Sequence, residues 1–242
     1  VSGWGREGWL DLRLGNYMYD GNPRNLEGGI MLGEVTNVTV ERCYIHDPNT
    51  KTNTWKGPTW KNLHPCGSDA ITMAMMSGMV VRYNDFIGSD SHRWNDAMES
   101  YANGSRIMHG TGDDSDVYGN MFYCSEDDCI ELDGGQMNVR VYNNRMEQSL
   151  CGISTAPNMS GPSYIFRNLI TDLGTSDNDQ TGSVIKAGGS PDKINGVQYL
   201  FNNTFDSPTH IMRNVGYSGL EYHAVTRNNI FISRAEKNAL EN

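Results

Sequence analysis

The stretch VRVYNNRM, residues 139–146, carries the pattern that decides the fold: an alternating apolar strand that ends in Asn, any residue and a large apolar residue. Six other segments share this pattern: VTVERCYI (38–45), VVRYNDFI (80–87), SDVYGNMF (115–122), YIFRNLI (164–170), QYLFNNTF (198–205) and VTRNNIF (225–231). Successive copies lie 24 to 41 residues apart. Such a repeat predicts a solenoid in which each copy forms one coil.

The shared Asn occurs in six of the seven copies, and Cys43 takes its place in the first. Its positions are Asn84, Asn120, Asn144, Asn168, Asn203 and Asn229. Short amide side chains tolerate tight turns, and stacked amides can hydrogen-bond from coil to coil. A β-sandwich seldom repeats such a corner, and a propeller blade needs about 40 residues. We therefore expect an all-β, right-handed parallel β-helix, a single-stranded solenoid of about seven coils.

The domain boundaries follow from where the repeat is recognisable. Residues 1–28 fit it poorly and form an N-terminal lead-in or partial coil, 29–233 form the β-helix, and 234–242 are a polar, helix-like C-terminal stub. Both ends look cut, which suits a fragment of a longer enzyme.

Composition narrows the function classes. The chain has 242 residues and a formal charge of −10, and an acidic surface opposes broad nucleic-acid binding. No apolar run approaches the roughly 20 residues needed to cross a bilayer, so no membrane partner is expected. Five cysteines leave open one or two disulfides or buried free thiols. The sequence does not reveal the oligomeric state.

A second register of short strands lies between the copies, and it predicts which side chains face outward. Its central apolar residues are Ile71, Met98, Ile130, Ile153, Ile185 and Met212. If these point into the core, alternation directs the next residue of each strand to solvent. Those next residues are Thr72, Glu99, Glu131, Ser154, Lys186 and Arg213, and two positions further on Tyr101 and Asp133 face out as well.

Stacking these strands brings acidic residues together, because neighbouring strands are about 4.8 Å apart. Glu99 would lie above Glu131, and Asp96 above Asp128, with Asp127 and Asp133 alongside. Like charges directly opposite each other destabilise a sheet, and crowded carboxyl groups raise one another's pKa. We therefore interpret the cluster as a catalytic site rather than a solvated face, although Asp also starts strands and caps turns, as Asp69 does.

Aromatic and basic residues near this cluster are candidates for substrate binding. The insertion at 47–69 brings Trp55 and Trp60, and SHRWNDAMES at 91–100 brings His92, Arg93 and Trp94. Long loops on a solenoid usually line its binding face, and indole rings can stack on sugars, although each Trp could equally cover the core. We assign substrate binding to His92, Arg93, Trp94, Tyr101, Lys186, Arg213, Trp55 and Trp60.

Other chemistries lack their motifs. The chain has no phosphate-binding glycine loop, HExxH, GxSxG or paired CxxC, and its histidines show no metal-ligand spacing, so no metal site is assigned. The stretch GDDSD at 112–116 is a turn or a weak calcium loop, with the turn favoured.

Several of these motifs resemble the pectin-lyase-like β-helix superfamily, and the resemblance spans roughly 28–233. Within it the layout is similar to polygalacturonase-type glycoside hydrolases: Asn95-Asp96-Ala97 resembles their Asn-x-Asp strand start and Asp127-Asp128 their Asp-Asp pair. Of their Arg-x-Lys motif only Lys186 is present, and Leu150-Cys151-Gly152 replaces their Gly-His-Gly. The chain also resembles broadly defined β-helix-repeat proteins, including fucosidase-like and xylanase-like hydrolases.

This resemblance implies roles for three aspartates. Asp128 would be the general acid, and Asp96 with Asp127 would position the attacking water. We therefore expect a glycoside hydrolase acting on a polysaccharide or oligosaccharide, with no required cofactor, that is secreted, periplasmic or at the cell surface.

Two alternatives stay open. A polysaccharide lyase or uronate epimerase would abstract a proton with a basic side chain, for which Lys186, Arg213, His92 and Arg93 are candidates, while the acidic cluster held Ca²⁺. A non-catalytic, glycan-binding β-helix is the third interpretation.

Overall fold

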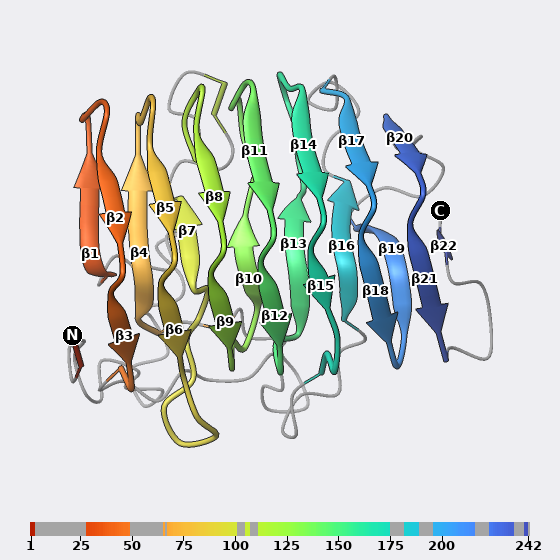
Figure 1. The fold of residues 1–242 in the computed structure, drawn as a ribbon, viewed down its shortest axis with the longest axis horizontal. Helices are drawn as coiled ribbons and strands as arrows, with labels where there is room; N and C mark the ends of the chain where they lie inside the picture. The colour runs from red at the N-terminus through yellow and green to blue at the C-terminus, as the bar shows by residue number, and fades with distance from the viewer. Residues whose placement is uncertain are drawn as a thin grey trace, which may run out of the picture.

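The computed structural model describes residues 1–2, 28–48, 65, 67–100, 105–106, 111–174, 182–188, 196–215, 223–234 and 240–241. Every secondary-structure element in these ranges is a β-strand, and the strands form three parallel sheets. The chain visits the three sheets in turn and then starts the next coil, which gives the predicted right-handed parallel β-helix of about seven coils (Figure 1). Within those ranges the chain has no helix with the length and apolarity that a membrane crossing requires.

The first sheet contains the strands that carry most of the candidate site. It consists of β1 (Gly28–Gly33), β4 (Asp69–Ala74), β7 (Met98–Ser100), β10 (Asp128–Glu131), β13 (Cys151–Thr155), β16 (Ser183–Gly188), β19 (His210–Val215) and β22 (Leu240–Glu241). In Figure 1 it lies behind the other two.

The second and third sheets complete each coil. The second contains β2 (Thr39–Glu41), β5 (Val80–Arg82), β8 (Asp116–Tyr118), β11 (Val139–Tyr142), β14 (Ser163–Phe166), β17 (Gln198–Phe201) and β20 (Ala224–Arg227). The third contains β3 (Tyr44–His46), β6 (Asp85–Ile87), β9 (Met121–Tyr123), β12 (Arg145–Glu147), β15 (Leu169–Ile170), β18 (Thr204–Ser207) and β21 (Ile230–Ser233).

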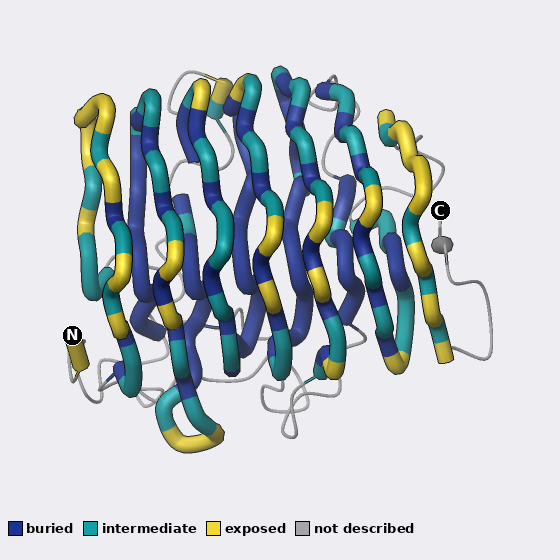
Figure 2. The backbone as a smooth tube through the Cα atoms, in the orientation of Figure 1, coloured by how far each residue is buried: buried dark blue, intermediate teal, exposed yellow. Residues whose placement is uncertain are grey.

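The core is built from columns of apolar side chains, one column for each sheet. The predicted column of the first sheet is confirmed, because Ile71 pairs with Met98, Met98 with Ile130, and the register continues through Ile153, Ile185 and Met212. The second sheet contributes Val81, Val117, Val141, Ile165 and Leu200, and the third contributes Phe86, Phe122, Met146, Ile170 and Phe205. Most of these side chains are fully buried, so the middle of the solenoid is a closed apolar core (Figure 2).

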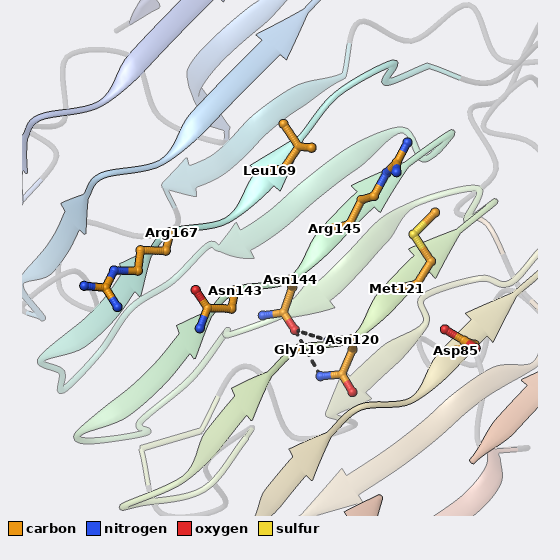
Figure 3. A pocket seen from close by; sticks show the side chains of 9 residues that line it. All are labelled: Asp85, Gly119, Asn120, Met121, Asn143, Asn144, Arg145, Arg167 and Leu169. Carbon is orange, nitrogen blue, oxygen red and sulfur yellow. Dashed lines mark hydrogen bonds between the residues drawn. The ribbon is translucent and has the colours of Figure 1, made fainter. Parts of the chain in front are cut away.

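The predicted asparagine stack is confirmed and forms a ladder at the corner between the second and third sheets. From Asn120 onwards each Oδ1 atom accepts two hydrogen bonds from the preceding Asn, as Asn144 Oδ1 does from the backbone N–H and the Nδ2 of Asn120, both at 3.0 Å (Figure 3). In the first rung Asn84 Oδ1 accepts from the backbone N–H of Cys43 (2.9 Å). The Nδ2 of Asn144 donates to the next Asn, Asn168 (3.1 Å), and to the carbonyl of Val117 (2.9 Å). Nearly every polar atom of the buried amide is thereby paired.

The residue before each rung adopts the left-handed backbone conformation that turns the corner. These residues are Arg42, Tyr83, Gly119, Asn143, Arg167, Asn202 and Asn228. A shallow surface depression lies over this corner, lined by Asp85, Met121, Arg145, Arg167 and Leu169 together with ladder residues (Figure 3). It belongs to the second and third sheets and therefore lies apart from the acidic residues of the first.

The described residues at both ends of the chain contact the solenoid. Leu240–Glu241, within the predicted C-terminal stub, forms β22, which pairs with β19 and so adds a strand to the first sheet. At the other end β1 begins at Gly28, and the carbonyl of Val1 accepts a hydrogen bond from the backbone N–H of His46 (2.9 Å). The rest of the lead-in, residues 3–27, lies outside the described residues.

Candidate active site

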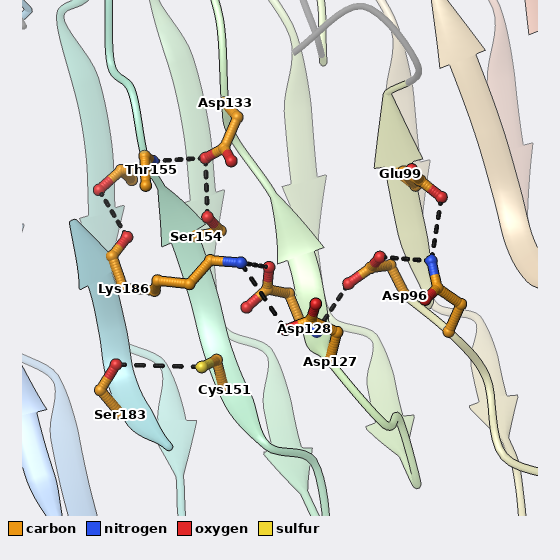
Figure 4. Close-up of polar contacts among 12 residues, drawn as sticks. Asp96, Glu99, Asp127, Asp128, Asp133, Cys151, Ser154, Thr155, Ser183 and Lys186 are labelled. Atoms are coloured by element: carbon orange, nitrogen blue, oxygen red, sulfur yellow. Dashed lines mark hydrogen bonds and ion pairs between the residues drawn. The ribbon is translucent and has the colours of Figure 1, made fainter. Parts of the chain in front are cut away.

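The parallel register of the first sheet assembles the predicted acidic column. Met98 pairs with Ile130, which sets Glu99 beside Glu131 and Asp96 beside Asp128. The backbone N–H of Asp128 donates to Asp96 Oδ1 at 2.6 Å. Further along the column Glu131 pairs with Ser154, Ser154 with Lys186, and Lys186 with Arg213. The solenoid therefore brings together carboxyl groups that lie about thirty residues apart in the chain (Figure 4).

The predicted exposure to solvent is wrong for Glu131 and Asp133, which are buried, and holds only in part for Glu99 and Lys186. Asp128 is fully buried, Asp133 and Glu131 are 3% and 6% exposed, and Glu99 and Lys186 are only partly buried. Alternation in a strand tells which way a side chain points but not what covers it. The column is a buried polar layer outside the apolar core.

Asp127, Asp128 and Lys186 form a charged group at the centre of this layer. The Nζ of Lys186 contacts Asp128 Oδ2 and lies 3.7 Å from Asp127 Oδ1 (Figure 4). Burial raises the pKa of Asp128 to about 7, although the ammonium of Lys186 opposes that rise. Burial alone would lower the pKa of Lys186, but the carboxyl groups of Asp127, Asp128 and Asp133 outweigh it and raise that pKa, so the ammonium stays charged.

The second Asp128 oxygen, Oδ1, is buried and makes no hydrogen bond. Asp133, by contrast, is fixed in place, because its Oδ1 accepts from Ser154 Oγ (2.8 Å) and from the backbone N–H of Ala156 (2.5 Å). Burial also raises the pKa of Asp133. Asp128 is therefore the carboxyl group that combines a pKa near neutrality with a free oxygen.

A second acidic group includes Asp69, which we expected to be only a strand start. Its Oδ1 accepts from the backbone N–H of Asp96 (3.3 Å) and from Asn95 Nδ2 (3.4 Å), and its Oδ2 accepts from Thr72 Oγ1 (3.3 Å). Burial raises the pKa of Asp69 to about 8. The sequence signal was available, because Asp69, Asp96 and Asp128 each precede the same short apolar strand.

Glu99 and Asn95 complete this second group. Burial is the main cause that raises the pKa values of Glu99 and Asp96, and neighbouring carboxyl groups add to it. Glu99 and Asp69 are hydrogen-bonded to each other, and burial raises the pKa of both carboxyl groups. Asn95 Nδ2 donates to Asp96 Oδ2 (2.7 Å) and Glu99 Oε2 (3.2 Å). Asn95 was not predicted as a site residue.

Burial and neighbouring carboxyl groups also change the pKa of Glu131, which lies between the two groups. Burial raises its pKa well above the ordinary value, the carboxyl groups of Asp133 and Glu99 add to the rise, and Lys186 opposes it. Burial and mutual repulsion therefore raise the pKa values of the carboxyl groups throughout the site.

Two of the predicted substrate-binding residues have structural roles instead. Trp94 is fully buried in the apolar core, so its indole cannot stack on a sugar. It precedes β7, where strand alternation no longer predicts the direction of a side chain. Arg93 is 3% exposed, and its guanidinium binds Asp90 (2.6 Å) and Glu126 (3.3 Å). That expectation is wrong for Trp94, which lies in the core, and the guanidinium of Arg93 is occupied by its two ion pairs.

The other predicted binding residues divide into described and undescribed positions. His92 Nδ1 lies 2.8 Å from the carbonyl oxygen of Pro48, and Arg213 is partly buried beside Lys186. Trp55, Trp60 and Tyr101 lie outside the described residues.

Two sets of side chains in the described residues could hold a metal ion. One oxygen each from Asp69, Asp96 and Glu99 lie within 4.8 Å of one another, and the same holds for ligand atoms of Asp127, Asp128 and Cys151. The turn at 112–116 uses its acids differently: Asp113 and Asp114 hydrogen-bond to Met137 and Asn138, and Asp116 pairs with Arg140 (2.6 Å).

The four described cysteines, Cys43, Cys124, Cys129 and Cys151, are free thiols, and Cys66 lies outside the described residues. Cys151 occupies the coil between Asp128 and Lys186. Burial, together with the Asp128 carboxyl group, raises the pKa of its thiol, which therefore stays neutral.

Comparison with known proteins adds no assignment: no family model matches the chain, and no curated protein matches it. The function must be argued from the geometry of the site.

Proposed function

We propose that this protein is a glycoside hydrolase that cleaves a polysaccharide by carboxyl-group acid and base catalysis. The observation that supports this most is Asp128, whose pKa is raised to about 7 and whose Oδ1 makes no hydrogen bond. A general acid must be protonated at working pH and have a free oxygen for the leaving group. The resemblance of Asn95–Ala97 and Asp127–Asp128 to polygalacturonase-type hydrolases points the same way.

In this mechanism Asp128 Oδ1 would give its proton to the glycosidic oxygen. Lys186, held on Oδ2, keeps the carboxyl group oriented and stabilises the carboxylate that remains after proton transfer. Asp127 would orient and deprotonate the attacking water because it flanks Asp128, and Asp96, whose pKa is raised, would help to orient that water. Asp128 is fully buried, so productive binding of a saccharide must open a path to Oδ1.

The lyase or epimerase alternative is less well supported by the same geometry. Elimination needs a neutral basic side chain near the reacting carbon. Lys186 is surrounded by carboxyl groups that raise its pKa, which makes it a poor base at neutral pH. A binding-only protein would gain nothing from buried, stacked carboxyl groups, because such groups cost stability.

The test is a turnover assay on a panel of plant and algal polysaccharides that records both new reducing ends and the ultraviolet absorbance of unsaturated products. Reducing ends without absorbance support hydrolysis, and absorbance would replace it with elimination. Asp128→Asn should lower turnover by about 10²–10⁴-fold with an unchanged circular dichroism spectrum. Asp114→Asn, on an exposed turn, is the matched control. A fully active D128N protein would remove Asp128 from the mechanism.

A polysaccharide substrate would be met outside the cytoplasm. The proposal therefore includes a secreted, periplasmic or cell-surface location.

A further inference from the structure

Three aspartates at or just before the starts of β4, β7 and β10 are joined by hydrogen bonds from coil to coil. The backbone N–H of Asp96 donates to Asp69 Oδ1 (3.3 Å), and the backbone N–H of Asp128 donates to Asp96 Oδ1 (2.6 Å, Figure 4). Each aspartate side chain therefore holds the backbone of the aspartate in the next coil. The chain of bonds begins at Asp69 and ends at Asp128.

Asn95 connects the side chains of the first two aspartates. Its Nδ2 donates to Asp96 Oδ2 (2.7 Å) and to Asp69 Oδ1 (3.4 Å). The Asp96 carboxyl group is thus bound at both oxygens, Oδ1 by the backbone of Asp128 and Oδ2 by Asn95. Asp69 accepts hydrogen bonds from Asn95 and from the backbone of Asp96, so it holds two of the groups that fix this carboxyl group.

The Asp69 side chain is itself held in one geometry. It is fully buried in β4, which is buried along its whole length, and its Oδ2 accepts from Thr72 Oγ1 (3.3 Å). A side chain locked by packing and hydrogen bonds on a strand can orient its neighbours precisely. Asp85 shows the difference, because it also begins a strand, β6, but is exposed to solvent.

We propose that Asp69 is a positioning residue, which holds Asp96 and, through Asp96, the backbone of Asp128 in the geometry that hydrolysis needs. This inference rests on the proposed function, in which Asp128 is the general acid and Asp96 helps to orient the water. Misplacement of reacting groups by about 1 Å can lower a rate by about 10²-fold. Because Asp69 acts through Asp96, its loss should lower kcat and leave KM nearly unchanged.

The kinetic test compares two substitutions at this position in the whole chain. Asp69→Ala removes the acceptor oxygens and should lower kcat by about 10–100-fold, with KM changed by less than about threefold. Asp69→Asn keeps Oδ1 as an acceptor for the backbone of Asp96 and for Asn95, and should retain kcat within about threefold. Asp85→Ala is the matched control and should behave as the parent does. Full kcat in Asp69→Ala, or an equal loss in Asp69→Asn, would overturn the proposal.

Hydrogen exchange of the Asp128 backbone N–H, followed by NMR without any saccharide, tests the same contacts independently of turnover. In Asp69→Ala this N–H should exchange at least about tenfold faster than in the parent, and in Asp69→Asn at nearly the parent rate. The backbone N–H of Asn144 is the internal reference, because a general loss of stability would speed the exchange of both. Exchange at Asp128 that is unchanged relative to Asn144 in Asp69→Ala would overturn the proposal.

The two measurements separate this inference from the proposed hydrolase. A parent chain that cleaves no saccharide refutes the hydrolase, and the exchange rates still decide whether Asp69 holds Asp128. If Asp69→Ala does not fold, Thr72→Val replaces it, since this variant removes the hydrogen bond to Asp69 Oδ2 at nearly constant side-chain shape. Exchange at Asp128 should then be at least about twofold faster than in the parent, and an unchanged rate would overturn the proposal.

Discussion

The asparagine ladder and the acidic column are built by the same geometry and have opposite energetics. In both, the coil repeat places like side chains one above another. An amide carries both a donor and an acceptor, so each rung satisfies the next, as Asn120, Asn144 and Asn168 do. Ionised carboxylates only accept and repel one another, so Asp96, Glu99 and Glu131 must gain protons, the Lys186 charge or a cation. In this solenoid the stack of amides stabilises the fold, whereas the stack of carboxyl groups raises pKa values and can form a reactive site.

The largest change in stability is expected from breaking the ladder in its middle. Asn144→Ala leaves the buried backbone N–H of Asn120 without an acceptor, whereas the Nδ2 of Asn120 keeps the carbonyl of Val81. The variant also loses three side-chain hydrogen bonds, from Asn120 Nδ2 to Asn144 and from Asn144 Nδ2 to Asn168 and to Val117. The unpaired N–H costs about 1–3 kcal/mol and each lost bond about 0.5–1.5 kcal/mol, so the free energy of unfolding should fall by about 3–7 kcal/mol in urea denaturation. A fall below about 1 kcal/mol would show that the ladder contributes little.

An effect of pH on stability is expected from the acidic column. In the unfolded chain Asp titrates near pH 4, whereas in the folded protein the pKa values of Asp69 and Asp128 are about 8 and about 7. Below about pH 4 both carboxyl groups are protonated in the folded and in the unfolded state, so no stability is lost. As the pH rises from there towards 8, the unfolded state releases protons that the folded state keeps, so folding becomes less favourable. In a chelator, Tm should fall by more than about 4 °C between pH 5 and pH 8, and a Tm that rises instead would contradict the raised pKa values.

Replacing one carboxyl group of the acidic column by a neutral amide should stabilise the protein, whereas breaking the asparagine ladder should destabilise it. In chelator at pH 8, Glu99→Gln should raise the free energy of unfolding by about 1–2 kcal/mol, because a neutral amide replaces a carboxyl group that burial and Asp69 disfavour as an anion. Thermal denaturation of parent and variant side by side measures this. A variant less stable than the parent would contradict this prediction, because it would mean that the contacts of the Glu99 carboxyl group stabilise the folded protein.

The smallest effect is expected at the exposed position before a ladder rung. Arg167 has a φ of 56°, which costs an ordinary residue about 1–2 kcal/mol, and Gly relieves that cost while making the unfolded chain more flexible. Arg167→Gly should therefore change the free energy of unfolding by less than about 1 kcal/mol. It is the matched control for Asn144→Ala, and a loss as large as that of the ladder variant would show that the corner itself, rather than the amide stack, is sensitive.

The fold could be predicted because its information is local and repeated. The Asn-x-apolar corner fixes the turn, and the alternation of Ile71, Met98 and Ile130 with their polar neighbours fixes which face is buried. Register then follows, since a slip of one residue would move a whole apolar column to the outside.

The site could be predicted only in part, for physical reasons that concern particular residues. Alternation gave the direction of Glu99, Glu131 and Lys186 but could not tell that they are shielded from water. Asp69 was not predicted as a site residue, because an Asp at the start of a strand is explained by its structural role alone until its neighbours in space are known. Trp94 was misassigned because it lies before β7, in an isolated β-bridge with Ser125, where the alternation of β7 does not apply.

The position of the acidic column within the solenoid has a consequence for partial unfolding. Its residues come from β4, β7, β10, β13 and β16, while β1 precedes them and β19 and β22 follow. Repeat proteins can open coil by coil, because each coil contacts only its neighbours. β10 is buried along its whole length, whereas β19 is only partly buried. Amide hydrogens of β19 should consequently exchange with deuterium before those of β10, and the carboxyl groups would keep their spacing while less buried coils open and close.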